Sequence, residues 1–397
     1  MHLRLLYLTF QEDAPLYAGV LNKIRGQAAA FCALGFSTTY SAWKGNAFHF
    51  YGDAPAAVPI DADRQVMRRF YEIAAGYLTR NPCEVLYVRL DRVDFGVVSL
   101  LKRAKACGVK HILLEIPNYP YLRDYVRTAK SVSDPKRRLL STVKVNLFAA
   151  EDRLAGPHLK GLADAAILYG DTASDFYGVP AKNATNGIDC AVLPPVPWPK
   201  KSTEIVLIGV AGTLWWQAYD RVLRGMANWN QQKDPRWTFR FLLVGGDEKE
   251  MPAFREQVRA LGLSDAVEMP GFKTGEELLS YYRRADAGVS TLGCFRRGLT
   301  HCSSLKAREY AALGLPFLYA YSDDALPGDA PWALRLSNDD TPVDMGRVAA
   351  FVEQCREDPR IVLQEREYAQ EVYDWRSILA DALQFGGVAL PQGPEQA

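Results

Sequence analysis

The densest group of chemically active side chains stands in one stretch of the second half of the chain, Thr300-His-Cys-Ser-Ser-Leu-Lys-Ala-Arg-Glu-Tyr-Ala-Ala-Leu-Gly-Leu-Pro316. The spacing predicts a helix that begins after the two serines and ends at Gly314, because glycine and a following proline favour helix termination. One face of this helix is apolar, and the opposite face carries Lys306, Arg308 and Glu309. Cations and a carboxylate presented together predict a ligand that is anionic and rich in hydroxyl groups.

The residues before this helix predict where it lies in the fold. Asp286 to Ser290 forms a short apolar run typical of a buried strand, and a polar loop connects it to the helix. Open α/β sheets bind ligands beyond the carboxyl ends of their strands. The charged helix is therefore expected at a ligand-binding edge.

Composition limits the class of protein. The chain has 397 residues, a formal net charge of +1 and 48% hydrophobic residues, which predicts a soluble globular protein, with two domains as the first expectation. This charge gives no electrostatic argument for a nucleic-acid partner. The seven cysteines are scattered without a Cys-x-x-Cys pair, so neither a zinc site nor a disulfide framework is predicted.

No targeting or membrane-spanning segment is predicted. The apolar run from Leu5 to Phe10 is too short for a signal sequence and is typical of a first strand. No stretch approaches the roughly 18 apolar residues that span a bilayer. We therefore expect a cytoplasmic protein.

Strands alternate with helices along both halves of the chain. Strands are predicted at 3–9, 36–43, 84–88, 110–116, 164–169 and 181–185, and again at 204–210, 238–244, 266–269, 286–290 and 317–319. Helices between them predict two doubly wound parallel sheets, an α/β fold. A proline-rich segment, 186–201, separates the two halves and predicts a stiff linker with a cleft between the domains.

The segment 125–148 departs from this alternation. It carries six basic residues against Asp134 alone, together with an apolar stripe at helical spacing formed by Leu139, Leu140, Val143 and Leu147. One interpretation is a surface helix that docks its apolar stripe on the first domain. The other is a basic amphipathic surface that contacts anionic lipid headgroups or an acidic acceptor.

The ordered motifs of the second half resemble retaining GT-B glycosyltransferases of family 4. The resemblance rests on Gly245-Gly246, Met269-Pro-Gly-Phe272, Ala285-Asp-Ala-Gly288 and Ser304 to Pro316, and on Asn186-Gly-Ile-Asp189, which is similar to the Asn-Gly-Val-Asp at that family's domain junction. Glu115-Ile-Pro-Asn-Tyr-Pro-Tyr121 and Trp216-Gln-Ala-Tyr-Asp-Arg221 resemble a bacterial surface-polysaccharide subgroup. Together these motifs cover most of the chain in order.

The resemblance implies two Rossmann-like domains that face a cleft. It places an acceptor-side domain at 1–185, a linker at 186–201 and a donor domain at 202–373, with a C-terminal helix, 374–390, that returns to the first domain. It also implies a nucleotide-sugar donor, held mainly by the second domain, and a glycan or polyprenyl-linked acceptor. No further cofactor and no metal ion are expected.

Two family carboxylates mark the donor site. Glu309 occupies the later position, where a carboxylate accepts from both ribose hydroxyls. His301 stands at the earlier position, which contacts the transferred sugar in the family, and a neutral imidazole accepts only one hydrogen bond. His301 is either a ligand of the sugar or a partly exposed loop histidine.

The leaving diphosphate requires positive charge. The turn Gly212 to Ala218, including Thr213, carries no cation where the family usually places two. The candidate cations are therefore Lys306, Arg221, Arg296 and Arg297. Backbone amides at the helix start supplement them, and the complete donor-side set adds Gly212, Thr213, Gly245, Ser303, Ser304 and Leu305.

The acceptor side is predicted in the first domain. Gly19 fits the glycine-rich loop that follows the first strand in the family, and Lys23 faces the same cleft. The remaining candidates stand at or after strand ends: Arg89, Asp94, Asn118 and Tyr119.

Three other interpretations compete with a metal-independent GT-B transferase. Asp61-Ala-Asp63 resembles a metal-binding pair of the GT-A class, although its place before a helix favours an N-cap. A nucleotide-sugar epimerase and a catalytically silent partner subunit also bind the donor. We predict a retaining, metal-independent transferase that builds a surface glycan at the inner face of the membrane, with 125–148 contacting the anionic surface.

Overall fold

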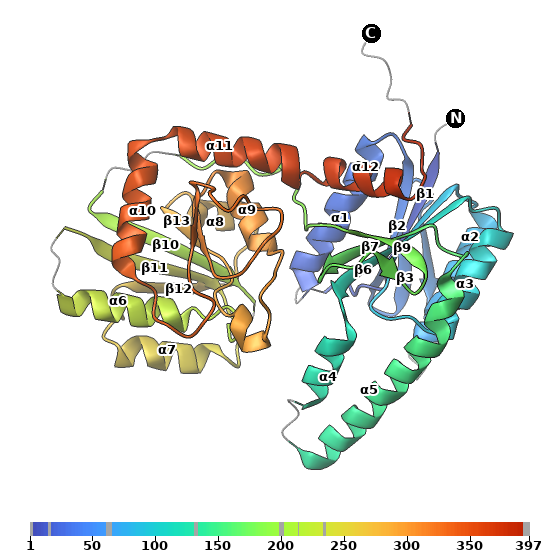
Figure 1. Ribbon diagram of the computed structural model, residues 1–397, viewed down its shortest axis with the longest axis horizontal. Coiled ribbons are helices and arrows are strands. Elements are labelled where there is room, and N and C mark those ends of the chain that lie inside the picture. Colours follow the sequence, from blue (N-terminus) through green and yellow to red (C-terminus); the bar gives the residue numbers. More distant parts are fainter. Residues whose placement is uncertain are drawn as a thin grey trace, which may run out of the picture. The chain divides into compact units, whose positions relative to one another are not determined.

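The computed structural model describes residues 3–14, 17–60, 66–130, 134–197, 202–212, 214–232 and 236–391. The chain forms two compact units, unit 1 from Met1–Thr185 with Trp375–Ala397 and unit 2 from Asn186–Asp374 (Figure 1). The predicted donor residue Thr213, the Asp61-Ala-Asp63 sequence and residues 198–201 of the proline-rich segment lie outside the described residues. The described part of that segment belongs to unit 2, where Cys190 and Val196 are buried in the core.

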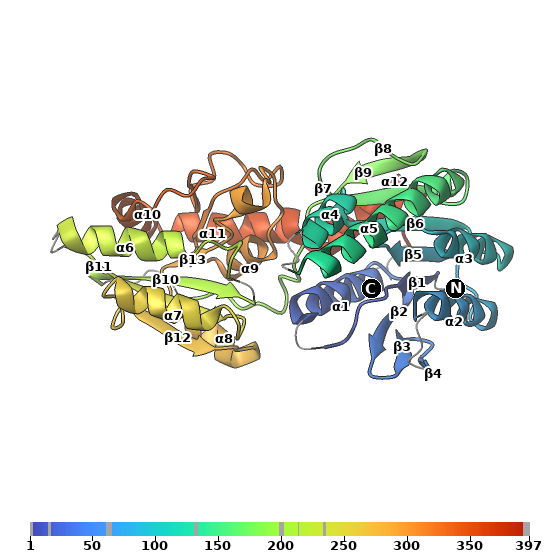
Figure 2. The ribbon, with the colours of Figure 1, turned by 90° about the horizontal axis from the view of Figure 1, so that it is seen from below.

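Unit 1 is built on a sheet of nine strands in the order β4-β3-β2-β1-β5-β6-β7-β9-β8 (Figure 2). The strands are β1 (Arg4–Leu8), β2 (Ser37–Lys44), β3 (Ala47–Gly52), β4 (Ala56–Pro59), β5 (Val85–Arg89), β6 (His111–Tyr119), β7 (Ala165–Gly170), β8 (Asp175–Phe176) and β9 (Val179–Asn183). Its central strands, from β2 through β1, β5, β6 and β7 to β9, are parallel, as predicted. The antiparallel strands β3, β4 and β8 at the two edges were not predicted.

Alternate residues of the parallel strands pack against helices on opposite faces of the sheet. Leu5 and Tyr7 lie in the core under α1 and α12, whereas Leu6 and Leu8 lie in the core under α2 and α3 (Figures 1 and 2). Successive strand residues point to opposite faces, so a fully buried strand is apolar throughout. These helices are α1 (Ala18–Ala33), α2 (Val66–Arg80), α3 (Phe95–Ala106) and α12 (Trp375–Phe385).

The basic segment forms two helices, α4 (Leu122–Lys130) and α5 (Pro135–Ala155), followed by the 3₁₀ turn η2 (Gly156–Leu159). The carboxylate of Asp134 accepts from the backbone N–H of Arg137 at 2.7 Å, and Pro135 occupies the first helical position. Both features favour a helix start at this point. Helix α5 continues past Phe148, the end of the basic segment, to Ala155, and Asp152 and Ala155 near its end are buried in unit 1.

Unit 2 contains six parallel strands in the order β12-β11-β10-β13-β14-β15. They are β10 (Glu204–Ala211), β11 (Thr238–Gly245), β12 (Val267–Gly271), β13 (Ala287–Val289), β14 (Phe317–Tyr319) and β15 (Ala333–Arg335). The helical elements are α6 (Asp220–Gln232), α7 (Met251–Ala260), α8 (Gly275–Tyr282), η3 (Cys294–Arg297), α9 (Leu305–Leu313), α10 (Met345–Glu357), α11 (Arg360–Tyr368) and the π-helical turn η4 (Ala369–Tyr373). None of the described helices in the chain is long and apolar enough to cross a membrane.

Candidate functional site

The strand order of unit 2 changes direction between β10 and β13. From β10 the chain proceeds to β11 and β12 on one side, and then crosses to β13, β14 and β15 on the other. Open α/β sheets bind ligands at such a point, beyond the carboxyl ends of the two neighbouring strands, where the loops that follow them lie. Here these are the loop after β10, residues 212–219, and the segment after β13, residues 290–304.

Hydrogen bonds fix the two loops against each other. The backbone N–H of Leu292 donates to the carbonyl of Gln217 at 3.0 Å, and the Thr291 hydroxyl donates to the Gln217 side chain at 3.0 Å. The carboxylate of Glu250 accepts from the backbone N–H groups of Leu214 at 2.6 Å and Trp215 at 3.1 Å. The first loop is therefore held from both sides.

Helix α9 follows the second loop and lies directly against β13. A side chain at Gly288 would place its Cβ 2.5 Å from the ring of Tyr310, so glycine permits the close packing of α9 on the strand. The helix ends at Gly314, whose φ of +64° is costly for other residues. The predicted helix and its termini are confirmed.

Lys306 and Glu309 stand one helical turn apart on α9, and both side chains are half-buried. Burial lowers the pKa of Lys306 to about 8, although Cys302 and Glu309 oppose the shift. Burial also raises the pKa of Glu309, against the opposing effects of the Tyr282 hydroxyl and Lys306. The ammonium group of Lys306 lies 5.3 Å from the ring centre of Trp216, so the cation of α9 adjoins the loop after β10.

The prediction for Arg308 is wrong. It does not share an open charged face with Lys306, because its side chain is fully buried and pairs with Asp323 at 2.8 Å. Its Nε donates to the carbonyl of Asn186 at 3.1 Å, and its guanidinium lies 3.9 Å from the ring centre of Tyr373. Arg308 thus fastens the Asn186-Gly-Ile-Asp189 motif to α9.

Two of the predicted phosphate-binding arginines have protein partners. Arg221 is buried, and its guanidinium donates to the carbonyls of Leu292 and Thr341, both at 2.7 Å. Arg296 contacts the carboxylates of Asp220 at 2.7 Å and Asp340 at 3.1 Å. These contacts give both side chains a role in holding the loops in place.

The third arginine is different. Arg297 stacks its guanidinium 5.3 Å from the centre of the same Trp216 ring that Lys306 contacts. The cationic groups of Arg297 and Lys306 therefore both lie beside the Trp216 ring.

The other donor-side candidates lie in the two loops, at the end of β11 and at the start of α9. Gly212 follows β10 and is exposed, and Gly245 is the last residue of β11. Ser303 accepts from the backbone N–H of Asn186 at 2.8 Å, Ser304 accepts from the Ser290 hydroxyl at 3.2 Å, and Leu305 begins α9. His301 is exposed, and its Nδ1 lies 3.0 Å from the Thr300 hydroxyl.

In unit 1, two predicted acceptor-side cations converge on a buried carboxylate. Lys23 lies 3.1 Å from Glu115, and Arg89 pairs with the same carboxylate oxygen. Gln27 and Tyr7 donate to the other oxygen at 3.0 and 3.2 Å.

The charged groups of this cluster are buried and contact one another. Burial by itself would raise the pKa of Glu115, but Lys23 and Arg89 overcome this effect and lower it. Burial and Arg89 lower the pKa of Lys23 to about 8, against the opposing effect of Glu115. The prediction that Lys23 faces an open cleft is wrong, since Lys23 is buried against Glu115 and the Tyr169 ring.

The remaining acceptor-side residues also differ from the prediction. Gly19 lies in the first turn of α1 and not in a loop, and a Cβ there would meet nothing within 4 Å. Asn118 and Tyr119 lie within β6 and do not follow it. The strand continues because a register shift after Ile116 pairs Tyr119 with Gly170 of β7.

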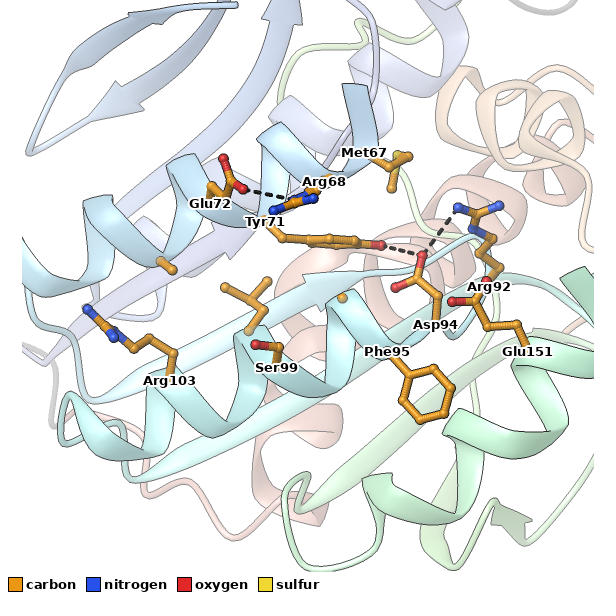
Figure 3. A pocket seen from close by; sticks show the side chains of 13 residues that line it. Met67, Arg68, Tyr71, Glu72, Arg92, Asp94, Phe95, Ser99, Arg103 and Glu151 are labelled. Carbon is orange, nitrogen blue, oxygen red and sulfur yellow. Dashed lines mark hydrogen bonds and ion pairs between the residues drawn. The ribbon is translucent and has the colours of Figure 1, made fainter. Parts of the chain in front are cut away.

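Asp94 lines a pocket of about 600 Å³ formed by α2, α3 and the end of α5 (Figure 3). Its carboxylate caps α3 by accepting from the backbone N–H of Val97 at 2.9 Å. It also accepts from the Tyr71 hydroxyl at 3.1 Å and pairs with Arg92 at 3.2 Å. The pocket further exposes Phe95 and Arg103.

The folds of both units resemble solved structures. The catalytic domain of starch synthase IV from Arabidopsis thaliana, bound to ADP and acarbose, is similar with a TM-score of 0.61 and 12% identity, over 98% of this chain and 99% of that one. Sucrose-phosphate synthase from Thermosynechococcus elongatus gives a TM-score of 0.58 and 15% identity, over 97% and 98% of the two chains. The fold is GT-B. The predicted fold class is confirmed.

A third solved structure with the GT-B fold and a family model add to this. Anabaena Alr3699/HepE, in complex with UDP and glucose, gives a TM-score of 0.54 and 12% identity, over 96% of this chain and 100% of that one. Residues 204–327 match the family model described as "Glycosyl transferases group 1". This match runs from β10 past α9 and contains the candidate donor site. Among curated proteins, none matches the chain in sequence.

Several residues that organise the GT-B units were not predicted as site residues. Glu115 begins the motif 115–121, but the signal of a buried ion cluster was a charged residue inside an apolar strand. Glu250 supports the loop after β10 from a distant point in the sequence, and no local pattern identifies it. Among the described residues, no group of three or more His, Cys, Asp or Glu side chains is placed to hold a metal ion.

Proposed function

We propose that the protein is a glycosyltransferase that moves a sugar, with retention, from a nucleotide-sugar donor to a growing surface glycan or a lipid-linked acceptor. The observation that carries the proposal is the position of Glu309 and Lys306 at the point in unit 2 where the strand order reverses. This point lies inside the region that matches the group 1 glycosyl transferases.

The donor suits the chemistry of this point. A carboxylate accepts from two vicinal ribose hydroxyls, which assigns Glu309 to the nucleoside. Lys306, with Arg297 across the Trp216 ring, supplies positive charge for the diphosphate. First-turn amides of α9 have no acceptor within a helix and favour an anion at its start. The UDP and ADP named in the complexes of Alr3699/HepE and starch synthase IV support a nucleoside diphosphate.

Retention and metal independence follow from the resemblance to family 4. The acceptor hydroxyl attacks on the face from which the diphosphate leaves, and the departing phosphate oxygen takes the proton. No strong protein base is required by this scheme. The charge that develops on the diphosphate is stabilised by Lys306, so this residue contributes most in the transition state.

We assign the acceptor to unit 1, and the pocket and the motifs of this unit support the assignment. Phe95 exposes 48% of its surface at the pocket, and an exposed aromatic ring offers an apolar platform for a sugar. Arg103 and Ser99 add hydrogen-bonding groups on α3. The resemblance of Glu115 to Tyr121 to a surface-polysaccharide subgroup favours an acceptor of the cell envelope, presented at the inner face of the membrane.

A second function is favoured by two observations. His301 is exposed in place of the family's first carboxylate, and Arg221 and Arg296 already have protein partners. A chain that binds the donor without turnover, as a partner subunit, would have these features. An epimerase is the remaining alternative.

The test measures binding and turnover together. Calorimetry with UDP, ADP and GDP identifies the nucleotide, and Glu309→Ala is expected to weaken its binding by roughly 10- to 100-fold, the loss typical of hydrogen bonds to a charged group. Glu277→Ala, which removes an exposed carboxylate of α8, is the matched control. Unaltered binding and kinetics in Glu309→Ala would remove this residue from the site.

Turnover separates the three functions. Nucleotide release that depends on an acceptor supports a transferase, and the anomeric configuration of the product, read by NMR, tests retention. Sugar conversion without an acceptor would identify an epimerase. Nucleotide-sugar binding without either reaction would identify a partner subunit.

A further inference from the structure

Helix α5 presents an apolar stripe to solvent. Leu139, Leu140, Leu147 and Leu154 each expose between 65% and 69% of their surface, and Val143 exposes 49%. Residues spaced four and seven apart lie on one face of a helix, so these five side chains form one continuous stripe along α5. Single exposed leucines are ordinary on protein surfaces, but an aligned row of them is not.

The opposite face of α5 attaches the helix to unit 1. Asp152 is buried, and its carboxylate accepts from the Tyr121 and Tyr177 hydroxyls and from the backbone N–H of Val93. Val145 and Ala155 are buried on the same side. The apolar stripe therefore does not dock on unit 1, and the interpretation of residues 125–148 as a docked surface helix is wrong for its apolar face.

The stripe has exposed cations within it and along one side. Lys136 lies within the stripe, Arg137 and Lys144 lie along one side of it, and Arg138 lies on the side of Val145. All four are exposed, and none of them forms an ion pair within the part of the chain that the structure describes. Long basic side chains beside an apolar face reach toward anionic groups while the apolar face is buried. The first half of α5, which carries them, extends beyond the sheet of unit 1 with α4 beside it (Figure 1).

We propose that α5 is a membrane-docking surface, on which the Leu139–Leu154 stripe inserts into the headgroup region of a bilayer and the flanking cations bind anionic lipids. A helix of this kind lies in the plane of the interface with its apolar face about 5–10 Å deep. The 21 residues of α5 give the stripe enough length for several side chains to insert together. The inference concerns a surface separate from the donor site and does not rest on the proposed function.

The charge distribution decides between a bilayer and a second copy of the chain. A symmetric contact of the stripe with itself would bring the same basic flanks of both copies together, which is electrostatically unfavourable. An anionic bilayer satisfies the apolar stripe and the cations at the same time. This is the reason for assigning the surface to lipid.

The test is cosedimentation of the full-length protein with vesicles, in the absence of nucleotide and acceptor. Vesicles of phosphatidylcholine alone are compared with vesicles that also contain phosphatidylglycerol. The wild-type chain is expected to bind the anionic vesicles, and Leu139→Ser with Leu147→Ser to reduce the partition coefficient by roughly tenfold or more, since exposed leucine side chains lose their apolar burial. Arg137→Glu with Lys144→Glu is expected to reduce binding to anionic vesicles only, and added salt to mimic this effect.

Matched controls come from unit 2 and from α2. Leu363→Ser removes a leucine of α11 that is 63% exposed, and Arg80→Glu with Arg255→Glu reverses two exposed charges elsewhere. All these positions are exposed, so unchanged thermal unfolding is expected for every variant and is measured first. Equal vesicle binding by the wild type and both α5 variants would overturn the proposal, as would an equal loss in the controls.

Two further readouts separate this proposal from its rivals. Sedimentation velocity without vesicles measures self-association, and a wild-type dimer that Leu139→Ser with Leu147→Ser converts to a monomer, without any vesicle binding, would assign the stripe to a second copy instead. Transfer to a water-soluble acceptor is expected to be unchanged in the α5 variants. Loss of vesicle binding and failure of glycosyl transfer are thereby observed independently.

Discussion

At the scale of single residues, the main feature of the candidate site is a pair of half-buried charged residues on α9, whose pKa values are shifted by burial. Lys306 and Glu309 are half-buried one turn apart, and the ammonium group of Lys306 lies 5.3 Å from the ring centre of Trp216. Burial disfavours the charged form of each group, which is why the pKa of the lysine falls and that of the carboxyl rises. An anionic ligand would favour the protonated, charged form of Lys306. Ligand affinity should therefore depend on pH, which can be measured.

The affinity for the nucleoside diphosphate is expected to depend on pH through Lys306. With a pKa of about 8 in the free protein, Lys306 is charged below pH 8 and loses its proton above it. Affinity should therefore fall by about twofold from pH 7 to 8, and above pH 8 by up to about tenfold per pH unit. Calorimetry at several pH values measures this dependence.

Substitutions separate charge from position at this residue. Lys306→Arg keeps its charge at every pH of the experiment, so its affinity is expected to stay level above pH 8. Lys306→Met should bind weakly throughout. The exposed Lys249→Arg is the control and should behave as the wild type. An identical pH profile for Lys306→Arg and the wild type would contradict a phosphate contact.

At the scale of elements, the position of α9 depends on its contact with β13. Tyr310 packs on Gly288, and its hydroxyl lies 3.3 Å from the carbonyl of Val289, the last residue of the strand. The strand ends where the loop to η3 begins, so a shift of α9 on β13 would displace Lys306 and Glu309 together. Helix and strand therefore act as one unit in the site.

Gly288→Ala is expected to destabilise unit 2 by about 1–3 kcal/mol, the usual cost of an added methyl group in a packed core. Its Cβ would lie 2.5 Å from the Tyr310 ring. The double variant Gly288→Ala with Tyr310→Leu should lose less stability than the sum of the two single variants, because the clash is removed. Denaturant unfolding measures all three free energies.

The control for this cycle is Gly328→Ala. A Cβ at this exposed glycine meets nothing within 4 Å, so the change should stay within about 0.5 kcal/mol. Additive losses in the double variant would show that the Tyr310 ring does not limit the space at Gly288. Nucleotide affinity of Gly288→Ala, measured below its unfolding transition, tests whether a shifted α9 weakens the site.

At the scale of the whole molecule, the chain builds unit 1 from both of its ends. It leaves unit 1 after Thr185, forms unit 2, and returns at Trp375. Trp375, Leu379 and Leu383 of α12 are buried in the core under α1, and Gly26 of α1 admits the Trp375 ring at 3.0 Å from its Cβ position. An ion pair of 2.8 Å joins Lys182 of β9 to Asp381 of α12. The core of unit 1 is therefore complete only after α12 has been made.

Leu379→Ala and Leu383→Ala are each expected to destabilise unit 1 by about 2–5 kcal/mol, as for other buried leucines. Hydrogen exchange read by mass spectrometry should show lost protection in α1 and in the strands of unit 1, while β10 to β14 keep theirs. The exposed Gln384→Ala in the same helix should change neither unit. Equal loss of protection in both units would contradict separate cores.

Local sequence determined the elements and the class of the fold. Continuous apolar runs, glycines after helices and the Ser303-Ser304 start predicted the parallel strands and α9, because these signals act within a few residues. The hairpin of β2 and β3 was also written locally, as Gly45-Asn46 between two strand-forming runs, but was not recognised. The order of motifs predicted GT-B, which the solved structures confirm.

Only the tertiary structure decided what each charged residue does. In the sequence, Lys306, Arg308 and Glu309 form one polar group. In the fold, Arg308 is buried and pairs with Asp323, whereas the other two lie where the strand order of unit 2 reverses. Lys23 and Arg89 likewise converge on Glu115, from three separate elements. The reason is that burial and charge pairing depend on residues far apart in sequence, 15 positions for Arg308 and 108 for the contact of Tyr7 with Glu115. For the apolar stripe of α5, the helical spacing was visible in the sequence. Only the fold shows that the stripe faces solvent.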